Sequence, residues 1–112
     1  MKAEVIPVLR VSDAEQATAW WARLGFAHEW THRFFEGAPA FVSVIADQRV
    51  FLSEHTGDAR PDTLLYLWVD ELDRIAAEFD VTPAPAEWND SVDEIEVVDP
   101  DGNRLRIGQR RR

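Results

Sequence analysis

Apolar and polar residues near the start of the chain follow the pattern typical of a strand and then a helix. Residues 5–11 (VIPVLRV) are a short β-branched run, which predicts a strand. Ser12 and Glu15 have the S-x-x-E spacing of a capping box, and apolar residues then recur at helical spacing as far as Gly25. Because glycine commonly follows the last turn of a helix, we expect this helix to end there.

Three further strands are expected before the middle of the chain. The runs FAHEWTHR (26–33), PAFVSVIA (39–46) and RVFLSEH (49–55) are rich in aromatic and β-branched residues. The polar separators between them are short enough for hairpins. We therefore expect three consecutive antiparallel strands.

The same order of elements is predicted a second time. A strand, a helix opened by Asp70 and Asp73, a loop with one short edge strand, and two strands flanking a DPDGN turn are expected at residues 63–69, 70–79, 83–91, 92–98 and 104–108. Superposing Val11 on Val69 gives an offset of 58 residues. The pattern therefore predicts a βαβββ unit written twice, with repeat halves at about residues 1–57 and 58–112 of one domain.

Two such units predict an α+β fold. We expect a curved, mostly antiparallel sheet with helices on one face, because a single unit cannot bury its sheet alone. The other, concave face must be covered by a ligand or by a second subunit. Function is expected on that face.

Composition and charge narrow the class of partner. The chain has no cysteine, which excludes disulfides and thiolate chemistry, and its net charge of −9 disfavours binding to nucleic acid. No apolar stretch approaches the length of a membrane span, and the first residues lack a signal-peptide pattern. We expect a soluble cytoplasmic protein without a nucleic-acid or membrane partner. The run from Gln109 to Arg112 is expected to be a solvated tail.

Five segments together resemble a known family. In order and spacing, VIPVLRVSD, WWARLGF, RVFLSEH, TLLYLWVDELD and VVDPDGNRLRIG are similar to the vicinal oxygen chelate superfamily, which includes glyoxalases, bleomycin-resistance proteins and dioxygenases. The resemblance implies that the family's metal-ligand positions fall on Ile6, Leu64 and Arg106. Isoleucine and leucine have no ligating atom, and arginine brings a positive charge where the family has a carboxylate. We therefore expect no metal, no cofactor and no catalytic residue at these positions.

Other chemistry has weaker support in the sequence. His28 and His32 are four residues apart on an expected strand, a span of about 13 Å that is too long for one shared ion. His55 could join a metal site only through the fold. No G-x-S-x-G motif occurs, and the paired carboxylates, such as Glu94 and Glu96, are typical of solvated faces.

Strand alternation separates core aromatics from candidate binding residues. If positions 6, 64 and 106 face the concave side, Val8, Arg10, Tyr66, Trp68 and Arg104 face it too, while Val5, Leu9, Val11, Leu65, Leu67, Val69, Leu105 and Ile107 lie under the helices. Trp20, Trp21 and Phe79 are on helix stripes and are expected in the core. The candidate ligand-binding residues are Glu29, Trp30, Phe34, Phe35, Phe51, Ser53, Tyr66, Trp68, Trp88 and Arg106. Flat rings with acidic neighbours suit a planar, cationic, amphiphilic ligand.

Within the superfamily, the pattern is most similar to the bleomycin-resistance type. That resemblance implies a binding protein and not an enzyme: a domain-swapped homodimer whose arm crosses near Pro7 and whose interface clefts sequester a small-molecule antibiotic. Arg106 and Trp88 depart from the family pattern, since Arg104 and Arg106 would oppose a cationic drug unless Glu29 or Glu54 paired them. Two alternatives are a superfamily enzyme, such as a lyase or dioxygenase, with a non-standard metal site, and a dimer whose partner fills the aromatic cleft.

Overall fold

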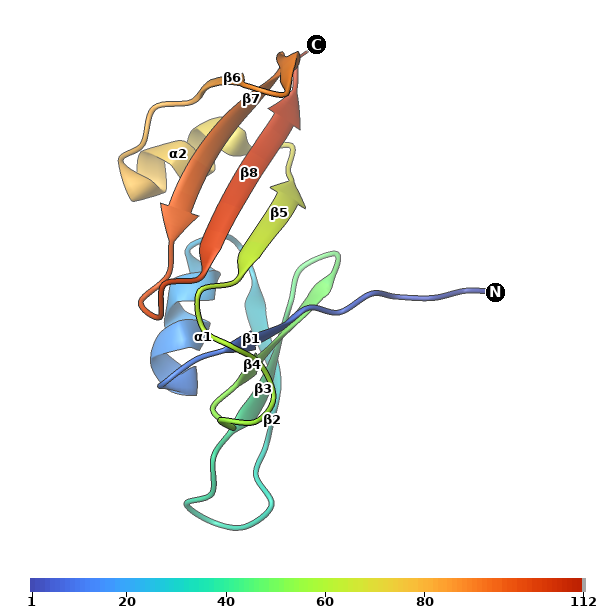
Figure 1. Cartoon of the computed structure of the whole chain (residues 1–112), viewed down its shortest axis with the longest axis vertical. Helices are drawn as coiled ribbons and strands as arrows, with labels where there is room; N and C mark the ends of the chain where they lie inside the picture. Colours follow the sequence, from blue (N-terminus) through green and yellow to red (C-terminus); the bar gives the residue numbers. More distant parts are fainter. Residues whose placement is uncertain (112) are drawn as a thin grey trace. The chain divides into compact units, whose positions relative to one another are not determined.

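Each half of the chain folds as a strand, a helix and three more strands. A computed structural model describes residues 1–111 and divides the chain into two compact units, Met1–Pro61 and Asp62–Arg112 (Figure 1). The elements of the first unit are β1 (Val8–Arg10), α1 (Ala14–Ala22), β2 (Ala27–His32), β3 (Phe41–Ile45) and β4 (Arg49–Ser53). Those of the second are β5 (Leu64–Trp68), α2 (Leu72–Phe79), β6 (Ala84–Ala86), β7 (Asn89–Val98) and β8 (Arg104–Arg110).

Both units have the same sheet topology. The first sheet has the order β1-β4-β3-β2 and the second the order β5-β8-β7-β6. In each sheet the first and last strands of the unit pair in parallel, β1 with β4 and β5 with β8, while the other pairings are antiparallel. The α+β class and the repeated βαβββ order expected from the sequence are confirmed. Within each unit, one helix covers one face of the sheet (Figure 1).

The covered face of each sheet forms the core. In the first unit, Trp21 of α1 is fully buried and makes edge contacts with Phe26 and Trp20, at ring-centroid distances of 5.0 Å and 5.7 Å. In the second unit, Ile75 of α2 is buried over the same face as Ile107. The other buried strand residues include Leu9, Val42, Val44, Leu52, Ile95, Val97 and Leu105. The predicted burial of Trp20 and Trp21 on the inner stripe of α1 is therefore confirmed. The strand alternation that placed Leu105 and Ile107 of β8 under the helix is confirmed as well.

The helix caps differ from the expected ones by one residue. Asp13, and not Ser12, is the N-cap of α1, and its carboxylate accepts a hydrogen bond from the Gln16 amide at 3.0 Å. The predicted capping box between Ser12 and Glu15 is therefore wrong. Aspartate is as good a cap as serine and adds a negative charge at the positive end of the helix. In α2 the N-cap is Glu71, without a side-chain cap bond, and not Asp70.

The chain termini also differ from expectation. The first strand begins at Val8 and not at residue 5, and Val5 is 87% exposed, so its placement in the core is wrong. Pairing starts only at Pro7, whose carbonyl accepts from the Phe51 amide at 2.9 Å but which has no N–H of its own to donate. At the other end, Gln109 belongs to β8 and its side-chain oxygen accepts from the Leu72 amide at 2.9 Å.

The prediction of a solvated tail is therefore wrong for residues 109–111, which contact other parts of the second unit. The Arg111 guanidinium donates to the Asp93 carboxylate at 2.7 Å, which lowers the pKa of that carboxyl. Arg112 lies outside the described residues. Among the helices that the structure describes, none has the length and apolar character needed to cross a membrane.

Candidate functional site

The open face of the first sheet, opposite α1, has three clustered aromatic rings. Register pairs Trp30 of β2 with Ser43 of β3, and Ser43 with Phe51 of β4, so these side chains share one face. Trp30 stacks on Phe41 with a centroid distance of 6.1 Å and lies 5.3 Å from Phe51. Offset ring contacts of this kind are favourable beyond simple burial. Trp30 and Phe51, both expected in the site, are thus together, and Phe41 joins them.

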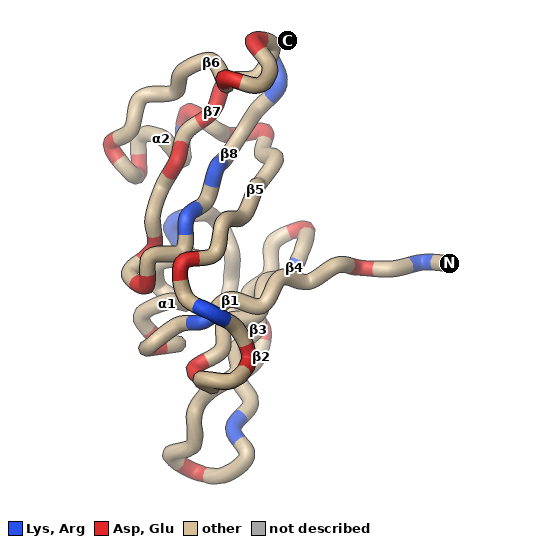
Figure 2. The backbone as a smooth tube through the Cα atoms, in the orientation of Figure 1, with Lys and Arg blue, Asp and Glu red and all other residues tan. Residues whose placement is uncertain are grey.

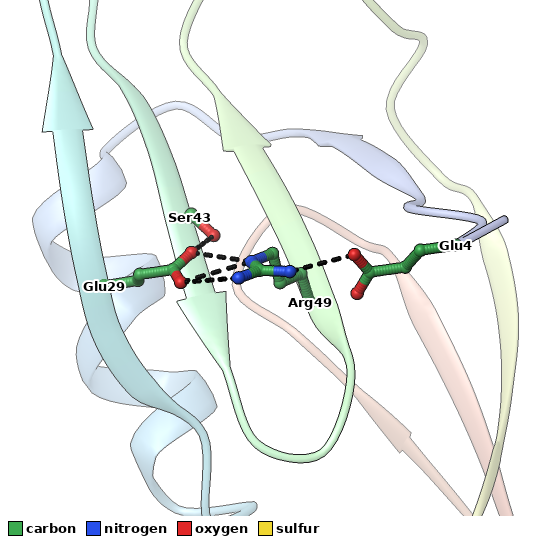
Figure 3. Close-up of polar contacts among 4 residues, drawn as sticks. All are labelled: Glu4, Glu29, Ser43 and Arg49. Carbon is green, nitrogen blue, oxygen red and sulfur yellow. Dashed lines mark hydrogen bonds and ion pairs between the residues drawn. The ribbon is translucent and has the colours of Figure 1, made fainter. Parts of the chain in front are cut away.

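An arginine with two carboxylate partners lies on the same face. Arg49 of β4 donates from Nε to Glu29 Oε1 at 2.9 Å and from Nη1 to Glu4 Oε1 at 2.9 Å (Figure 3). The Ser43 hydroxyl, on β3 between them, donates to the same Glu29 oxygen at 2.7 Å. Arg49 and then Ser43 lower the pKa of Glu29, and the two carboxylates raise the pKa of Arg49. The charges of this face are therefore satisfied internally, since each carboxylate has the guanidinium as its partner.

The remaining candidates in the first unit are not equally placed. Ser53 is fully buried; its hydroxyl donates to Asp58 at 2.6 Å and accepts from the His55 amide, so this side chain is not available at the surface. Phe34 and Phe35 lie in the β2–β3 connection and are exposed. Phe34 makes edge contacts with the imidazoles of His32, at 4.8 Å, and His55, at 5.9 Å.

The open face of the second sheet has an aromatic corner, formed by Tyr66, Trp68 and Trp88. Tyr66 and Trp68 alternate along β5, and Trp88 lies in the two-residue turn between β6 and β7. Their centroids are 5.3 Å, 6.0 Å and 6.0 Å apart, all with edge geometry. The three side chains remain 37%, 44% and 58% exposed, respectively. Three large rings that touch one another and still face solvent form an apolar surface on which a flat ligand can stack.

One carboxylate oxygen holds the aromatic corner together. Glu94 Oε2 accepts from the Tyr66 hydroxyl at 2.8 Å and from the Trp88 indole N–H at 3.0 Å. The Tyr66 ring crosses β8 at Gly108, where a Cβ atom would lie 2.1 Å from the tyrosine oxygen. Partial burial and the Glu94 contact raise the pKa of Tyr66 to about 12, so the phenol stays protonated and acts as a donor.

Several arginines lie along β8, one of the two inner strands of the second sheet. Arg106 is paired with Tyr66 in the register, on the open face as expected, and its Nε donates to Glu96 at 3.1 Å. The Arg110 guanidinium carbon lies 3.9 Å from the centre of the Trp68 ring, a cation–π contact. Arg106 is therefore paired by Glu96, and not by Glu29 or Glu54. The two oxygens of Glu54 accept from the amides of α1 and of the β3 entry, Ala14 and Ala40.

The family's metal-ligand positions are distributed over both units, and the three histidines all belong to the first unit. Leu64 and Arg106 lie on the open face of the second sheet, whereas Ile6 precedes β1 in the first unit. His28 bonds to Thr31 at 2.7 Å on β2. Within residues 1–111, no group of three or more His, Cys, Asp or Glu side chains is placed to hold a metal ion.

Sequence reasoning missed several residues of these faces. Alternation along β3 could have placed Phe41 and Ser43 beside the candidate rings, because they occupy odd positions of one strand. Arg49 lies 20 residues from Glu29, and only the strand order brings the two together. The sequence predicts a solvated carboxylate at Glu94, whereas in the structure Glu94 accepts from Tyr66 and from Trp88, which the turn between β6 and β7 positions.

Comparisons with known proteins agree with this architecture. A family model described as a glyoxalase superfamily protein matches residues 2–112. A bleomycin-binding protein solved in complex with bleomycin is similar, at 22% identity and a TM-score of 0.72, over 96% of this chain and 98% of that chain. A comparison with curated proteins found no significant match.

Two further solved structures are similar over nearly the whole chain. A bleomycin resistance determinant encoded on the transposon Tn5 is 21% identical, with a TM-score of 0.72 over 97% of this chain and 98% of that chain. TnmS3, an antibiotic-binding protein from Streptomyces sp. CB03234, is 22% identical, with a TM-score of 0.76 over 98% and 97%. At these identities the likeness shows a shared fold.

Proposed function

The chain belongs to the glyoxalase superfamily, and from that premise we propose that it is a binding protein without catalytic activity, which sequesters an amphiphilic antibiotic of the bleomycin type or similar. Sequestration lowers the free concentration of a drug by stoichiometric binding, so protection saturates with the amount of protein. The proposed contacts are the exposed rings of the two open sheet faces.

The aromatic corner is the observation that carries this proposal. Glu94 accepts hydrogen bonds from Tyr66 and Trp88, Trp68 contacts both of their rings, and all three side chains still face solvent. A surface prepared in this way loses little side-chain entropy when a flat ring stacks on it, which favours affinity. The family's metal-ligand positions also have side chains without a ligating lone pair, which supports binding in place of metal-dependent catalysis.

The names of the similar structures support the same class of ligand. One was solved with bleomycin bound, one is a bleomycin resistance determinant and one is an antibiotic-binding protein. Each name describes that protein. For this chain, the exposed rings supply the physical reason to propose the same kind of partner.

We also propose that the protein acts as a homodimer, with ligand clefts at the subunit interface and an N-terminal arm that crosses near Pro7. Phe34 and Phe35 are exposed beside the first sheet, and burial of such rings between subunits would stabilise an assembly. Sedimentation of the purified chain at micromolar concentration should give twice the monomer mass. A monomer at every concentration, with ligand binding intact, would contradict the dimer alone.

The test of the function is a tryptophan-fluorescence titration with copper-loaded bleomycin, with a metal assay on the same sample. We expect saturable quenching near one drug per chain and no metal in the purified protein. Tyr66→Ala should weaken binding at least tenfold, whereas Tyr66→Phe, which keeps the ring, should weaken it less. No quenching would reject bleomycin as the ligand, and one equivalent of bound metal would favour an enzyme of the superfamily.

A further inference from the structure

The open face of the second sheet has three regular rows of side chains. The register places Arg104 between Leu64 and Val98, then Arg106 between Tyr66 and Glu96, then Gly108 between Trp68 and Glu94. Leu64 and Val98 are both exposed. A guanidinium thus lies between two apolar side chains at one end of the face, and the aromatic corner lies at the other.

The carboxylates of this face already have partners. Glu96 pairs with Arg106, and Glu94 accepts two hydrogen bonds from the aromatic corner. Arg104 has no side-chain hydrogen bond or ion pair with any residue from 1 to 111, and Arg110 contacts a ring and not a carboxylate. The charge that lacks an opposite partner on this face is therefore positive.

The first unit provides an internal comparison. In the shared register, with Val8 superposed on Tyr66, the position of Arg104 corresponds to that of Arg49. Arg49 bonds to Glu29 and Glu4, whereas its counterpart faces two apolar side chains. At the same position of the fold, the arginine charge is paired with carboxylates in the first unit, whereas in the second unit it remains available for a ligand.

A cationic ligand would meet competition on this face. The face of the Trp68 ring, where a planar cation would stack, is already covered by the Arg110 guanidinium at 3.9 Å. Like charges in close contact repel, so a ligand cation would have to displace this side chain. An anionic group has no such competitor at Arg104.

We propose that the open face of β5, β8 and β7 selects a planar aromatic ligand that carries an acidic group. The ring lies toward the aromatic corner, and the carboxylate, phenolate or sulfonate contacts Arg104, with Arg106 beside it. This inference rests on the proposed binding function and names the ligand chemistry of one of its faces. It differs from the cationic ligand expected from the sequence.

Dimensions and charge are consistent with this placement. Residues two apart on a strand are separated by about 7 Å, so two or three fused rings span the distance from Tyr66 to Arg104. The second unit has thirteen acidic residues and six arginines, yet the register and the Trp68 contact place Arg104, Arg106 and Arg110 on this face of β8. Figure 2 shows the basic positions that follow one another along β8. The contact is therefore local, and salt should screen the long-range repulsion of an anion by the rest of the chain.

The test uses two probes with the same ring and opposite charge, anthracene-9-carboxylate and 9-(aminomethyl)anthracene, each titrated against the full chain by tryptophan fluorescence. We expect the carboxylate to bind at least fivefold more tightly than the ammonium probe. Its affinity should hold or rise between 20 and 200 mM salt, conditions over which the Debye length falls from about 20 Å to about 7 Å.

Charge variants assign the effect to one side chain. Arg104→Gln should weaken carboxylate binding at least fivefold and leave the ammonium probe unchanged or stronger. Arg74→Gln removes the same charge from the exposed face of α2, where Arg74 pairs with Glu71, and should change neither probe more than twofold.

Failure of this inference is distinct from failure of the binding function. If the ammonium probe binds more tightly and Tyr66→Ala abolishes its binding, the aromatic face binds ligands but the anion preference is wrong. Equal loss in the Arg104 and Arg74 variants would also overturn it, because the effect would then be one of total charge. If neither probe binds while bleomycin still gives saturable quenching, the anion preference is wrong and the binding function stands; if bleomycin also fails, both proposals are contradicted.

Discussion

The two open sheet faces share one backbone design and differ in how their charged side chains are satisfied. In the first unit, Ser43 and Arg49 lock Glu29 into a network that also reaches Glu4. In the second, Glu94 pairs with no guanidinium among residues 1–111, and one of its oxygens instead accepts hydrogen bonds from Tyr66 and Trp88 of the aromatic corner. The comparison teaches that the repeat fixes which positions face outward, while the residues at those positions decide whether a face is closed by its own contacts or available for a ligand.

The units also differ in how their helices are anchored. Helix α1 has a side-chain cap and a fully buried tryptophan, whereas α2 has no cap bond and is held by smaller residues such as Leu72 and Ile75. Helix α1 therefore has both a side-chain cap and a larger buried anchor than α2.

The largest effect is expected from Trp21→Ala. This side chain is fully buried and packs edge-on against Phe26 at 5.0 Å, so its loss should reduce the free energy of unfolding by about 4 kcal/mol. Ile75→Ala in α2, which removes a smaller side chain, should cost about 3 kcal/mol. Urea denaturation of both variants measures the difference, and a smaller cost for Trp21→Ala than for Ile75→Ala would contradict the contrast in anchoring.

The next effect is the ionisation of Tyr66, the only tyrosine in the chain. Its pKa is raised to about 12, which lowers the ionisation constant about a hundredfold relative to a free phenol. The raised pKa stabilises the fold below pH 10, and this contribution is lost as the pH rises through the folded value. Absorbance at 295 nm after a rapid pH jump measures it, and Glu94→Gln should bring the pKa down. A titration near pH 10 in both proteins would show that the contact is absent.

A smaller effect, about tenfold in ligand affinity, is expected from Gly108→Ala. The added Cβ would occupy the space of the Tyr66 hydroxyl and push the ring away from Glu94. Stability should change little, since the ring can rotate and alanine suits a strand better than glycine. Gly57→Ala is the matched control, because a Cβ there meets no atom within 4 Å. Equal affinities for the two variants would exclude a role for the ring position.

The smallest effect is expected from the charge network of the first unit. Glu29→Gln should lower the melting temperature by roughly 2 °C at pH 7, because partly exposed ion pairs contribute little. Since the pKa of Glu29 is lowered from about 4.5, its contribution is fully present above pH 4.5 and disappears as the pH falls through the lower value. Melting curves of both proteins from pH 7 to pH 3 should therefore converge. A difference that persists at pH 3 would contradict the electrostatic origin.

Much of the fold could be predicted from the sequence because strand alternation and turn residues are local signals. The pattern at residues 63–69 correctly placed Tyr66 and Trp68 on the open face and left the others of that strand toward the helix. The helix stripe likewise placed Trp21 in the core. These predictions depend only on the period of the element in which each residue lies.

The contacts that define the two faces could not be predicted in the same way. Arg49 reaches Glu29 across β3, which requires the strand order β4-β3-β2. A bulge between His28 and Trp30 also shifts the alternation of β2, so Glu29 and Trp30 both belong to the open face although they are adjacent in sequence. Non-local pairing and a one-residue irregularity are not visible in local periodicity.

The most direct test of ligand binding on the open faces is an NMR titration of the indole N–H signals. The chain has five tryptophans, two on α1 and three on the open faces, so each resonance reports one location. On addition of metal-free bleomycin, the signal of at least one open-face tryptophan, Trp30, Trp68 or Trp88, should shift and saturate, while that of buried Trp21 stays unchanged. If no indole signal shifts, or if only those of α1 do, the drug does not bind on the open faces and the central claim is contradicted.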